Sequence, residues 1–433
     1  MNKYEDSIDM VALLKCIAPL SRTLANNDTD TALHLVQKVL SGSVIEGTPT
    51  GTKVWSWVVP PRWELDTATI RANGETLIDA AWSPLHVINY SQSFSGIVTR
   101  QEILKHIKTY PERPNAIPFS FSFYEPVWGF SMPHAWLDRF TSENYEVEIK
   151  TRFEPGVLNT LSLFIPGDNT ETFVICSNIC HPLQVNDSLT GVSVAVDIAN
   201  RLLAKSHRKY SYLILIVPET IGSITYLAGH PEMIENSIGG FFSEMLGTEG
   251  PMVGQRTRSG SSYWDHLLEE TLKQSGLPFE IVDFLKSASN DEKVMDSPGV
   301  DIPTFSITRS PYAEYHTSDD NIDIVNADRL REARDVLQNI IDFAEKDYIP
   351  VLTQPGPIFL SGHDLYPNWR DDPSLLPIWQ SFIDVMYSID GIHSVTQLAT
   401  KKNIPFDHFF YWTDAFEKKG LLEKKEYVKK REK

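Results

Sequence analysis

Five side chains that can bind or activate a metal ion each follow a run of apolar residues typical of a buried strand. They are His181 and Asp187 in "ICHPLQVND", Glu219 in "VPETIGS", Glu244 in "FFSEMLG" and His316 in "AEYHTSDDNID". Imidazole nitrogens combined with carboxylate oxygens are ligands that suit Zn²⁺ or a similar divalent ion. If the apolar runs are neighbouring strands of one sheet, we expect these groups to form one metal centre.

Each of the five residues also has a purely structural interpretation. A single histidine after a strand is more often a hydrogen-bonded structural residue than a ligand. Asp187 precedes the amphipathic stretch "SLTGVSVAVDIANRLL" and can cap the first turn of a helix. Glu219 can serve a first turn in the same way, and Glu244 can pair with a basic residue. Independent structural roles would have to place all five residues at one edge by coincidence, which favours a shared site.

A catalytic metal centre needs a position for water and a carboxylate, outside the ligands of the ion, that takes the proton of that water. A bound divalent ion lowers the pKa of water from about 16 to about 7. Glu219 is our candidate for the base, because it can take this proton and pass it to a leaving amine. The pattern predicts metal-assisted hydrolysis of an amide. The alternative that Glu219 is itself a ligand stays open.

Residues 146–350 alternate between strand-like and helix-like segments. The strand-like runs are "TFVICSNI", "YSYLILIVP", "IGGFFSEMLG" and "IPTFSIT", and the helix-like runs are "VSVAVDIANRLLAKS", "SSYWDHLLEETLKQSG" and "ADRLREARDVLQNIIDFAEK". Nearly continuous apolar strands between amphipathic helices predict an α/β fold with a mixed, mostly parallel sheet and helices on both faces. Ligands of such sheets bind outside the carboxyl ends of the strands, where the five candidate residues would lie.

Three further segments surround this predicted catalytic domain. Residues 1–53 contain two amphipathic helices broken at "NND", which we expect to pack on the catalytic domain. Residues 54–145 hold short aromatic and β-branched runs separated by Pro, Gly and Asn, which predict an inserted β-rich domain. Residues 360–433 hold three short helical patterns with turns at Gly391 and after Lys419, which resembles a winged-helix module.

Composition limits the class of protein. The chain has 433 residues, of which 42% are hydrophobic and 22% charged, so it can form two or three globular domains. Its formal net charge of −18 disfavours a nucleic-acid partner, because proteins bind phosphates with Lys and Arg. Its three cysteines do not suggest a disulfide framework, and no apolar run is long enough to span a bilayer. We therefore expect a soluble cytoplasmic protein without a membrane partner.

The order of the motifs resembles that of the zinc-dependent leucyl-type aminopeptidases, which are α/β proteins with a pair of zinc ions. The most specific parts are "CHP" with "ND" followed by "TG", the "PETIGS" turn and the "YHTSDDN" segment. More closely, nearly the whole chain is similar to a bacterial family of aminopeptidase-like proteins that is often encoded with polysaccharide-biosynthesis genes. Members of that family carry an inserted β-rich domain and a C-terminal winged helix.

The resemblance implies a role for each candidate ligand. His181 would bind one metal ion, Asp187 would bridge two, Glu244 would be a further ligand of the first ion, and His316 would bind the second. Glu219 falls where the aminopeptidases have two consecutive glutamates, one the base and the other a ligand.

Two departures from the family pattern weaken the second metal position. Thr220 follows Glu219 where a second glutamate would stand, and Leu183 replaces an aspartate that usually orients the imidazole of the histidine ligand. We therefore expect one firmly held zinc ion, with a second weak or absent.

Further residues near these motifs can bind a substrate. Asp291 and Glu292 match an Asp-containing motif near the aminopeptidase metal centre and can hold an α-ammonium group, although they can equally be solvated loop charges. Arg309, Tyr312 and Tyr315 lie close to His316 in the sequence and can contact a carboxylate or a developing oxyanion. Structural packing is an equal alternative for the two tyrosines.

Two other stretches have a functional and a structural interpretation. The aromatic stretch "FYEPVWGFSMPHAWLDRF" can wall a cleft, but it more often forms the core of a small domain. The basic tail "EKKGLLEKKEYVKKREK" can indicate nucleic-acid binding beside a winged helix, but a solvated terminal helix is the commoner structure. The acidic remainder favours packing or subunit contact for this module, which leaves a homo-oligomer open.

The leading prediction is a zinc-dependent hydrolase that acts on a small peptide or amino-acid amide with a free amino end. The incomplete glutamate pair motivates a second hypothesis, zinc-dependent aminoacyl cyclisation or transfer. The third is a regulator without enzymatic activity, whose winged helix binds DNA while the α/β domain senses a ligand.

Overall fold

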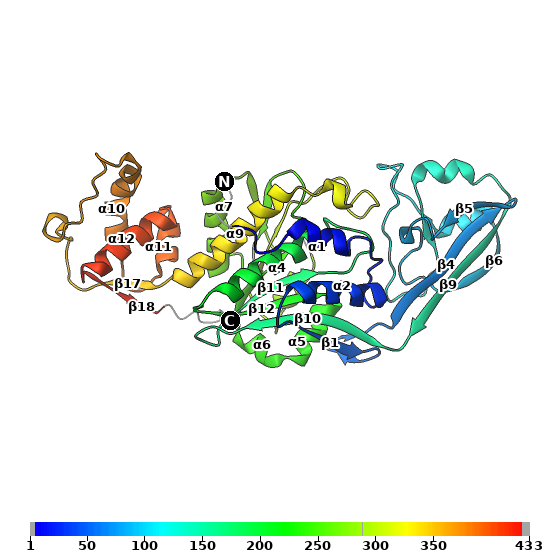
Figure 1. Cartoon of the computed structure of the whole chain (residues 1–433), viewed down its shortest axis with the longest axis horizontal. Coiled ribbons are helices and arrows are strands. Elements are labelled where there is room, and N and C mark those ends of the chain that lie inside the picture. The colour runs from blue at the N-terminus through cyan, green and yellow to red at the C-terminus, as the bar shows by residue number, and fades with distance from the viewer. Residues whose placement is uncertain (1–4, 288, 427–433) are drawn as a thin grey trace.

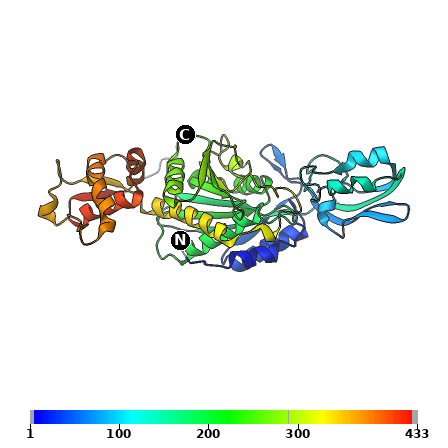
Figure 2. The same cartoon turned by 90° about the horizontal axis from the view of Figure 1, so that it is seen from above.

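The protein is elongated, with three regions in a row (Figures 1 and 2). The computed structural model describes residues 5–287 and 289–426. A helical region near the C-terminus lies at one end, a sheet covered by helices lies in the middle, and a β-rich region lies at the other end.

The central region is built on an eight-stranded sheet with the order β1-β10-β12-β11-β13-β16-β14-β15. Its strands are β1 (Val44–Pro49), β10 (Val157–Ile165), β11 (Thr172–Asn178), β12 (Ser211–Val217), β13 (Ser237–Ser243), β14 (Met252–Gln255), β15 (Phe279–Val282) and β16 (Thr304–Thr308). The four adjacent strands β12, β11, β13 and β16 are parallel. On one side of this group β10 pairs antiparallel with β12 and β1 with β10; on the other side β14 pairs antiparallel with β16 and parallel with β15. The predicted α/β fold with a mixed, mostly parallel sheet is confirmed.

Helices cover both faces of this sheet, as the apolar strands predict. All seven residues of β11 are buried, and they alternate between two cores. Phe173 and Ile175 pack in the core formed with α1 (Met10–Ile17), α2 (Asn27–Val39), α4 (Leu189–Ala204), α7 (Tyr263–Ser275) and α9 (Ala327–Lys346). Val174 and Cys176 pack in the core formed with α5 (Ile221–Gly229) and α8 (Glu292–Met295).

Local sequence signals set the ends of several covering helices. Asn26 caps α2 by accepting a hydrogen bond from the backbone N–H of Thr29. At α7, Ser262 and Asp265 form a reciprocal capping box, and Gly276 ends the helix at φ 70°. The short α6 (Pro231–Asn236) leads directly into β13.

The β-rich region contains a four-stranded antiparallel sheet with the order β5-β4-β9-β6. Its strands are β4 (Arg62–Ala72), β5 (Glu75–Asp79), β6 (Phe94–Thr99) and β9 (Asn144–Glu154), with the short elements β2 (Lys53–Val54), β3 (Trp57–Val58), α3 (Arg100–Ile103), β7 (Ile107–Lys108) and β8 (Phe130–Ser131) beside it. Because β9 runs to Glu154, this sheet extends beyond the boundary expected at residue 145. Phe130, Met132 and Phe140 are buried, so much of the aromatic stretch forms core.

The C-terminal region contains α10 (Leu376–Ser388), α11 (Val395–Lys402) and α12 (Phe406–Lys418) around the buried Trp412. β17 (Ile349–Leu352) pairs antiparallel with β18 (Leu422–Lys425). Leu422–Lys425 of the basic tail therefore form a strand and not part of the expected terminal helix, while residues 427–433 lie outside the described part of the chain. Assignment as a winged helix stays a prediction.

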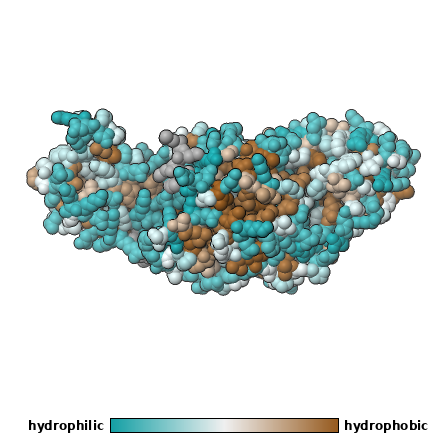
Figure 3. Space-filling view, in the orientation of Figure 1, coloured by the Kyte–Doolittle hydropathy of each residue, from teal (hydrophilic) through white to brown (hydrophobic). Residues whose placement is uncertain are grey.

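The surface differs between the three regions. On the face shown in Figure 3, hydrophobic residues gather over the middle of the molecule, where α1, α2 and α4 lie in Figure 1. Val39, Val44 and Leu203 are exposed apolar residues of α2, β1 and α4. No helix in the described part of the chain combines the length and the apolar composition needed to span a bilayer.

Candidate active site

Four neighbouring parallel strands bring the predicted residues to one edge of the sheet. The loop after β11 carries His181 and Asp187, and the segment after β12 carries Glu219. Glu244 directly follows β13, and His316 lies in the loop after β16. Parallel strands end at the same edge, so residues separated by more than a hundred positions in the sequence meet there.

Two histidines and one carboxylate form the centre of the site. Nε2 of His316 lies 3.0 Å from Oδ2 of Asp187, and the ring centroids of His181 and His316 are 5.4 Å apart. One ligand atom from each of the three residues lies within 4.8 Å of the other two. Ligand bonds to Zn²⁺ of about 2.0–2.2 Å place the donors of one ion roughly 3–4 Å apart, so the three side chains can share an ion after small rotamer changes.

The charge state of Asp187 suits a metal ligand. Burial raises the pKa of its carboxyl group, but the charges of His181 and His316 and the hydrogen bond from His316 outweigh burial and hold the pKa below its usual value. Asp187 is 2% exposed, so it is a buried anion between two imidazoles.

Glu244 offers a further oxygen to the same region. Its Oε1 accepts a hydrogen bond of 2.6 Å from Asn290, while its buried Oε2 has no hydrogen-bond partner among the described residues. Burial, and then the charge of Asp187, raise the pKa of Glu244 well above its usual range. A buried carboxylate with an unpartnered oxygen beside another carboxylate fits a site that holds a cation. The two imidazoles and Asp187 form a donor set that fits Zn²⁺, whereas Glu244 lies outside both groups of ligand atoms within 4.8 Å of one another.

Glu219 lies beside the Nε2 nitrogen of His181. Its Oε2 is 3.5 Å from Nε2 of His181, and its side chain is 24% exposed. One ligand atom each of Cys180, His181 and Glu219 also lie within 4.8 Å of one another. The position of Glu219 is therefore compatible with both alternatives left open by the sequence, a base beside the ion or a ligand of it.

Cys180 contacts the second nitrogen of the His181 ring. Its Sγ lies 3.5 Å from Nδ1 of His181 and accepts a hydrogen bond of 3.2 Å from the backbone N–H of Glu219. Burial, and then the charge of Glu219, raise the pKa of the thiol well above its usual value. The sulfur thus occupies the place that an orienting carboxylate usually takes beside a histidine ligand, since Leu183 cannot accept a hydrogen bond through its side chain.

A buried arginine that sequence reasoning missed supports the loop at residues 179–188. The guanidinium of Arg22 donates hydrogen bonds to the carbonyl oxygens of Ile179 at 2.8 Å, His181 at 2.6 Å and Gln184 at 2.6 Å. Burial lowers its pKa to about 10. Nothing in the sequence around Arg22 indicates this role, because its partners lie about 160 positions away.

Asp320 is a second missed residue, and it lies in the "YHTSDDN" segment itself. Its carboxylate accepts hydrogen bonds from the backbone N–H groups of Val185 at 3.1 Å, Asn186 at 2.7 Å and Asp187 at 3.0 Å. It also accepts a hydrogen bond of 2.5 Å from the hydroxyl of Tyr312. Burial, and then Asp187, raise the pKa of Asp320 to about 6. Asp320 therefore joins the two loops that carry the histidines.

The backbone of the site is strained. Five residues without the freedom of glycine have a positive φ: His181 at 91°, Leu183 at 60°, Thr220 at 63°, Met245 at 52° and His316 at 52°. Such conformations cost about 1 kcal/mol or more each and cluster at functional sites. His181 and His316 are candidate ligands themselves, and the other three residues lie one or two positions from a candidate ligand or base.

An aromatic wall from the β-rich region covers the histidines. The ring of Phe119 meets both His181 and His316 edge-on, with centroid distances of 5.2 Å. The backbone N–H of Phe119 donates a 2.8 Å hydrogen bond to the carbonyl of His316, and Pro118 forms a β-bridge with Thr317. The wall thus comes from residues just before the aromatic stretch singled out in the sequence.

The structure brings some predicted substrate-binding residues to the site and leaves others out. Tyr315 stacks on His316 with a centroid distance of 3.9 Å. Tyr312 instead binds Asp320, as described above. Arg309 does not reach the cluster, because its guanidinium pairs with Glu332 at 2.6 Å and donates to the carbonyl of Gly250.

Asp291 and Glu292 are both fully buried, so the alternative of solvated loop charges is wrong. Oδ1 of Asp291 accepts hydrogen bonds from the hydroxyl of Ser223 at 2.5 Å and the N–H of Thr220 at 3.0 Å. Burial raises the pKa of Asp291 to about 7, and Glu219 adds to this increase. Its Oδ2 has no hydrogen-bond partner among the described residues.

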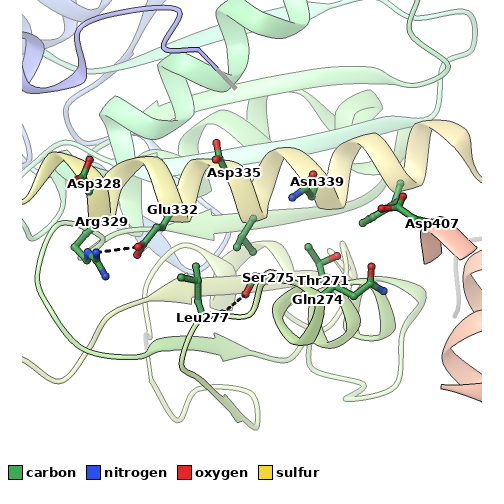
Figure 4. Close-up of a pocket in the computed structure, with 12 residues that line it drawn as sticks. Thr271, Gln274, Ser275, Leu277, Asp328, Arg329, Glu332, Asp335, Asn339 and Asp407 are labelled. Carbon is green, nitrogen blue, oxygen red and sulfur yellow. Dashed lines mark hydrogen bonds and ion pairs between the residues drawn. The ribbon is translucent and has the colours of Figure 1, made fainter. Parts of the chain in front are cut away.

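Two hollows of the molecule have a volume of about 560 Å³, and one of them lies beside the site. The first is a cleft that opens beside His316, between the β-rich region and residues 310–316. The second lies between α7 and α9, near Asp407 of α12 (Figure 4). In the second hollow Arg329 and Glu332 pair at 3.0 Å, and none of the metal-site residues lines it. Only the first is placed to hold a substrate of this site.

The chain is similar to known proteins over nearly its whole length. The model of a family described as a domain of unknown function (DUF4910) matches residues 11–347. A Clostridium acetobutylicum protein, provisionally named a polysaccharide biosynthesis protein with an aminopeptidase-like domain, is 30% identical over 434 residues, which cover 97% of each chain.

Two solved structures show the same fold. A crystal structure of a Clostridium acetobutylicum protein provisionally described as a peptidase has a TM-score of 0.85 and 29% identity, with 96% of each chain covered. A zinc aminopeptidase from Bacillus subtilis has a TM-score of 0.58 and 13% identity, with 79% of this chain and 96% of that chain covered. This chain therefore shares the mixed α/β fold of that aminopeptidase.

Proposed function

This chain belongs to the family described as a domain of unknown function (DUF4910), and we propose that it is a zinc-dependent hydrolase of the aminopeptidase type. Its substrate is a small peptide or amino-acid amide with a free amino end. The observation that carries this proposal is the cluster of His181, Asp187 and His316, whose ligand atoms lie within 4.8 Å of one another at the carboxyl edge of the sheet. The names of the relatives, a peptidase and a zinc aminopeptidase, support the same assignment.

His181, Asp187, His316 and Glu244 are the residues that hold the ion. A zinc ion in such a site supplies a Lewis acid that polarises a carbonyl group and activates water. One ion is firmly held. A second is weak or absent, because Thr220 offers no carboxylate and its backbone N–H is directed to Asp291.

Glu219 takes a proton from the attacking water and returns it to the leaving amine. Its side chain is partly exposed and lies at 3.5 Å from His181, so it can reach a substrate while remaining next to the ligands. General bases of this kind contribute about 10²–10⁴-fold to a rate. Tyr315 stacks on His316 and is 45% exposed, which supports a role in which its hydroxyl donates a hydrogen bond to the carbonyl oxygen as negative charge develops on it.

The acidic side of the site binds the free amine. Asp291 is buried and has one carboxylate oxygen without a hydrogen-bond partner among the described residues. An α-ammonium group offers three N–H donors and a positive charge, which complements such an oxygen. This preference directs the enzyme to the first residue of a chain and disfavours internal cleavage.

The test uses Glu219→Gln, which keeps the shape of the side chain and removes the base. With a library of aminoacyl amides, we expect the zinc-loaded wild type to release free amino acids, and the variant to lose about 10²–10⁴-fold in kcat while it retains zinc. A variant that turns over normally excludes Glu219 as the base, and loss of zinc from the variant identifies Glu219 as a ligand.

Mass spectrometry of the products separates hydrolysis from cyclisation. Hydrolysis adds the mass of water across the cleaved bond, whereas cyclisation removes ammonia or water without cutting the chain. Products without any cleavage would replace the hydrolase proposal with the cyclase alternative. Steep salt-dependent DNA binding without turnover would favour the regulator. A cytoplasmic location remains our expectation.

A further inference from the structure

The cleft beside His316 differs in charge from the rest of the site. None of the residues that line this cleft of about 560 Å³ carries a carboxylate. Lys108 is its one lysine or arginine, and no carboxylate among the described residues lies within ion-pair distance of it. The chain has a net charge of −18, so the absence of acidic residues from the lining of this hollow distinguishes it from the mostly acidic surface.

The site is therefore polarised across the candidate ligands. On the side of β12 and β13 there are three carboxylates, because Glu219 and Glu244 follow these strands and Asp291 accepts hydrogen bonds from Thr220 and Ser223. On the side of β16 the cleft presents His316, aromatic rings and Lys108. A substrate with a positive charge at one end and a negative charge at the other matches this polarity.

The walls of the cleft are fixed with respect to the ligands. Lys108 lies in β7, and its carbonyl oxygen accepts a 3.0 Å hydrogen bond from the N–H of Met132. On the opposite wall, the N–H of Ser318 donates a 2.8 Å hydrogen bond to the carbonyl of Ile117. Because the β-rich region is bonded in this way to the loop that carries His316, its cleft residues are held in position relative to His316.

Part of the remaining lining is aromatic. Tyr110, Phe119, Tyr312 and Tyr315 contribute rings to the cleft. Tyr110 and Tyr315 are 38% and 45% exposed, so part of each ring is available to a ligand. Aromatic walls favour an apolar or ring-containing side chain, and one lysine near them favours a carboxylate beside that side chain.

We propose that this cleft binds the carboxylate-bearing leaving part of the substrate and that Lys108 pairs with its carboxylate. The preferred substrates are then zwitterions of dipeptide size, with the free amine at the acidic side and an apolar or aromatic residue with a free carboxylate in the cleft. This inference rests on the proposed function, because the position of the ion sets the direction in which the substrate crosses the site.

Binding of two matched probes tests the inference without turnover. The probes are alanyl-phenylalanine and its C-terminal amide, which differ only in the carboxylate. Calorimetry with zinc-loaded Glu219→Gln protein should show that the free acid binds about tenfold more tightly than the amide, since one charge-assisted contact is present only in the acid. Adding Lys108→Gln should lower the affinity for the free acid until both probes bind alike.

Lys105→Gln is the matched control in the same background. Lys105 lies three positions from Lys108, is well exposed, pairs with Glu102 at 2.8 Å and does not line the cleft. This variant should keep the full preference for the free acid. Equal binding of the two probes, no binding of either, or a preference that survives Lys108→Gln overturns the inference.

The same two probes separate failure of the inference from failure of the proposed function. If the wild type does not cleave either probe but the Lys108-dependent preference is present, the hydrolase assignment fails while the cleft assignment holds. If the wild type cleaves the acid and the amide with equal kcat/KM and binds them equally, the hydrolase assignment holds while the cleft assignment fails.

Discussion

The two loops that carry the histidines are built in different ways. The loop at residues 179–188 is almost entirely buried, and polar side chains hold its backbone, Arg22 through its carbonyls and Asp320 through its N–H groups. The loop at residues 309–320 leaves Tyr315 exposed and is fastened by contacts with the β-rich region, among them the bond from Phe119 to His316.

This difference separates two tasks. The buried loop supplies His181 and Asp187 in a rigid, water-poor setting, which favours tight binding of an ion. The exposed loop supplies the second histidine ligand, His316, and places its neighbour Tyr315 at the cleft, which favours contact of this loop with the substrate. Changes to the support of the first loop should therefore reduce stability and metal affinity, whereas changes around the second should act mainly on substrate turnover.

Removal of the Arg22 guanidinium should have the largest effect. Arg22→Met keeps an apolar stem of similar length but leaves the buried carbonyls of Ile179, His181 and Gln184 without their donor. We expect the free energy of unfolding to fall by about 3–5 kcal/mol, measured by urea denaturation. Arg331→Met, at an exposed pair with Asp6 and Asp328, should change little. A loss below about 1 kcal/mol for Arg22→Met would contradict this role.

Asp320→Asn tests the residue that connects the two loops. The amide cannot accept from three backbone N–H groups and the Tyr312 hydroxyl together, so the loop that carries Asp187 loses part of its support. We expect zinc affinity to fall about 10–100-fold, measured by competition with a chelating dye. The control is Asp323→Asn, an exposed residue of the same segment. Unchanged zinc affinity in Asp320→Asn would show that the carboxylate is dispensable.

Cys180 tests whether sulfur orients the imidazole of His181. With an ion on Nε2, Nδ1 carries the proton and donates a hydrogen bond to the sulfur. Cys180→Ser keeps an acceptor and should retain zinc affinity within about threefold, while Cys180→Ala removes the acceptor and should lower it about tenfold. Equal affinities of the two variants would indicate that Cys180 only fills space.

Phe119→Ala should have the smallest effect on zinc affinity and should act mainly on substrate turnover. The change removes a wall that lies at 5.2 Å from both histidine rings and leaves the ligands of the buried loop in place. We expect kcat/KM to fall about fivefold, with zinc affinity within about twofold of the wild type. Phe164→Ala, an exposed residue of β10, is the control. A large loss of zinc from Phe119→Ala would contradict the separation of the two tasks.

The central fold could be predicted because its signals are local. Apolar runs and amphipathic helices between residues 146 and 350 specify buried strands and their covering helices, and parallel strands place their carboxyl ends together. This reasoning located His181, Asp187, Glu219, Glu244 and His316 at one edge of the sheet.

The supporting contacts could not be predicted, because they depend on distant parts of the chain. Arg22 reaches the site only through the packing of the N-terminal helices on α4, and Phe119 through the position of the β-rich region. Proximity in sequence was also misleading, since Arg309 lies seven positions from His316 but pairs with Glu332. The acidic pair at Asp291 has the composition of a surface loop, yet it is buried because Ser223 and Thr220 bind it.

Zinc content is the most direct test of the account. Plasma mass spectrometry of carefully purified protein should find about one zinc ion per chain in the wild type and almost none in Asp187→Asn, because that change removes the buried anion between the two imidazoles. Wild-type protein without zinc above background, or equal zinc in both proteins, would contradict the claim that His181, Asp187 and His316 hold a catalytic ion.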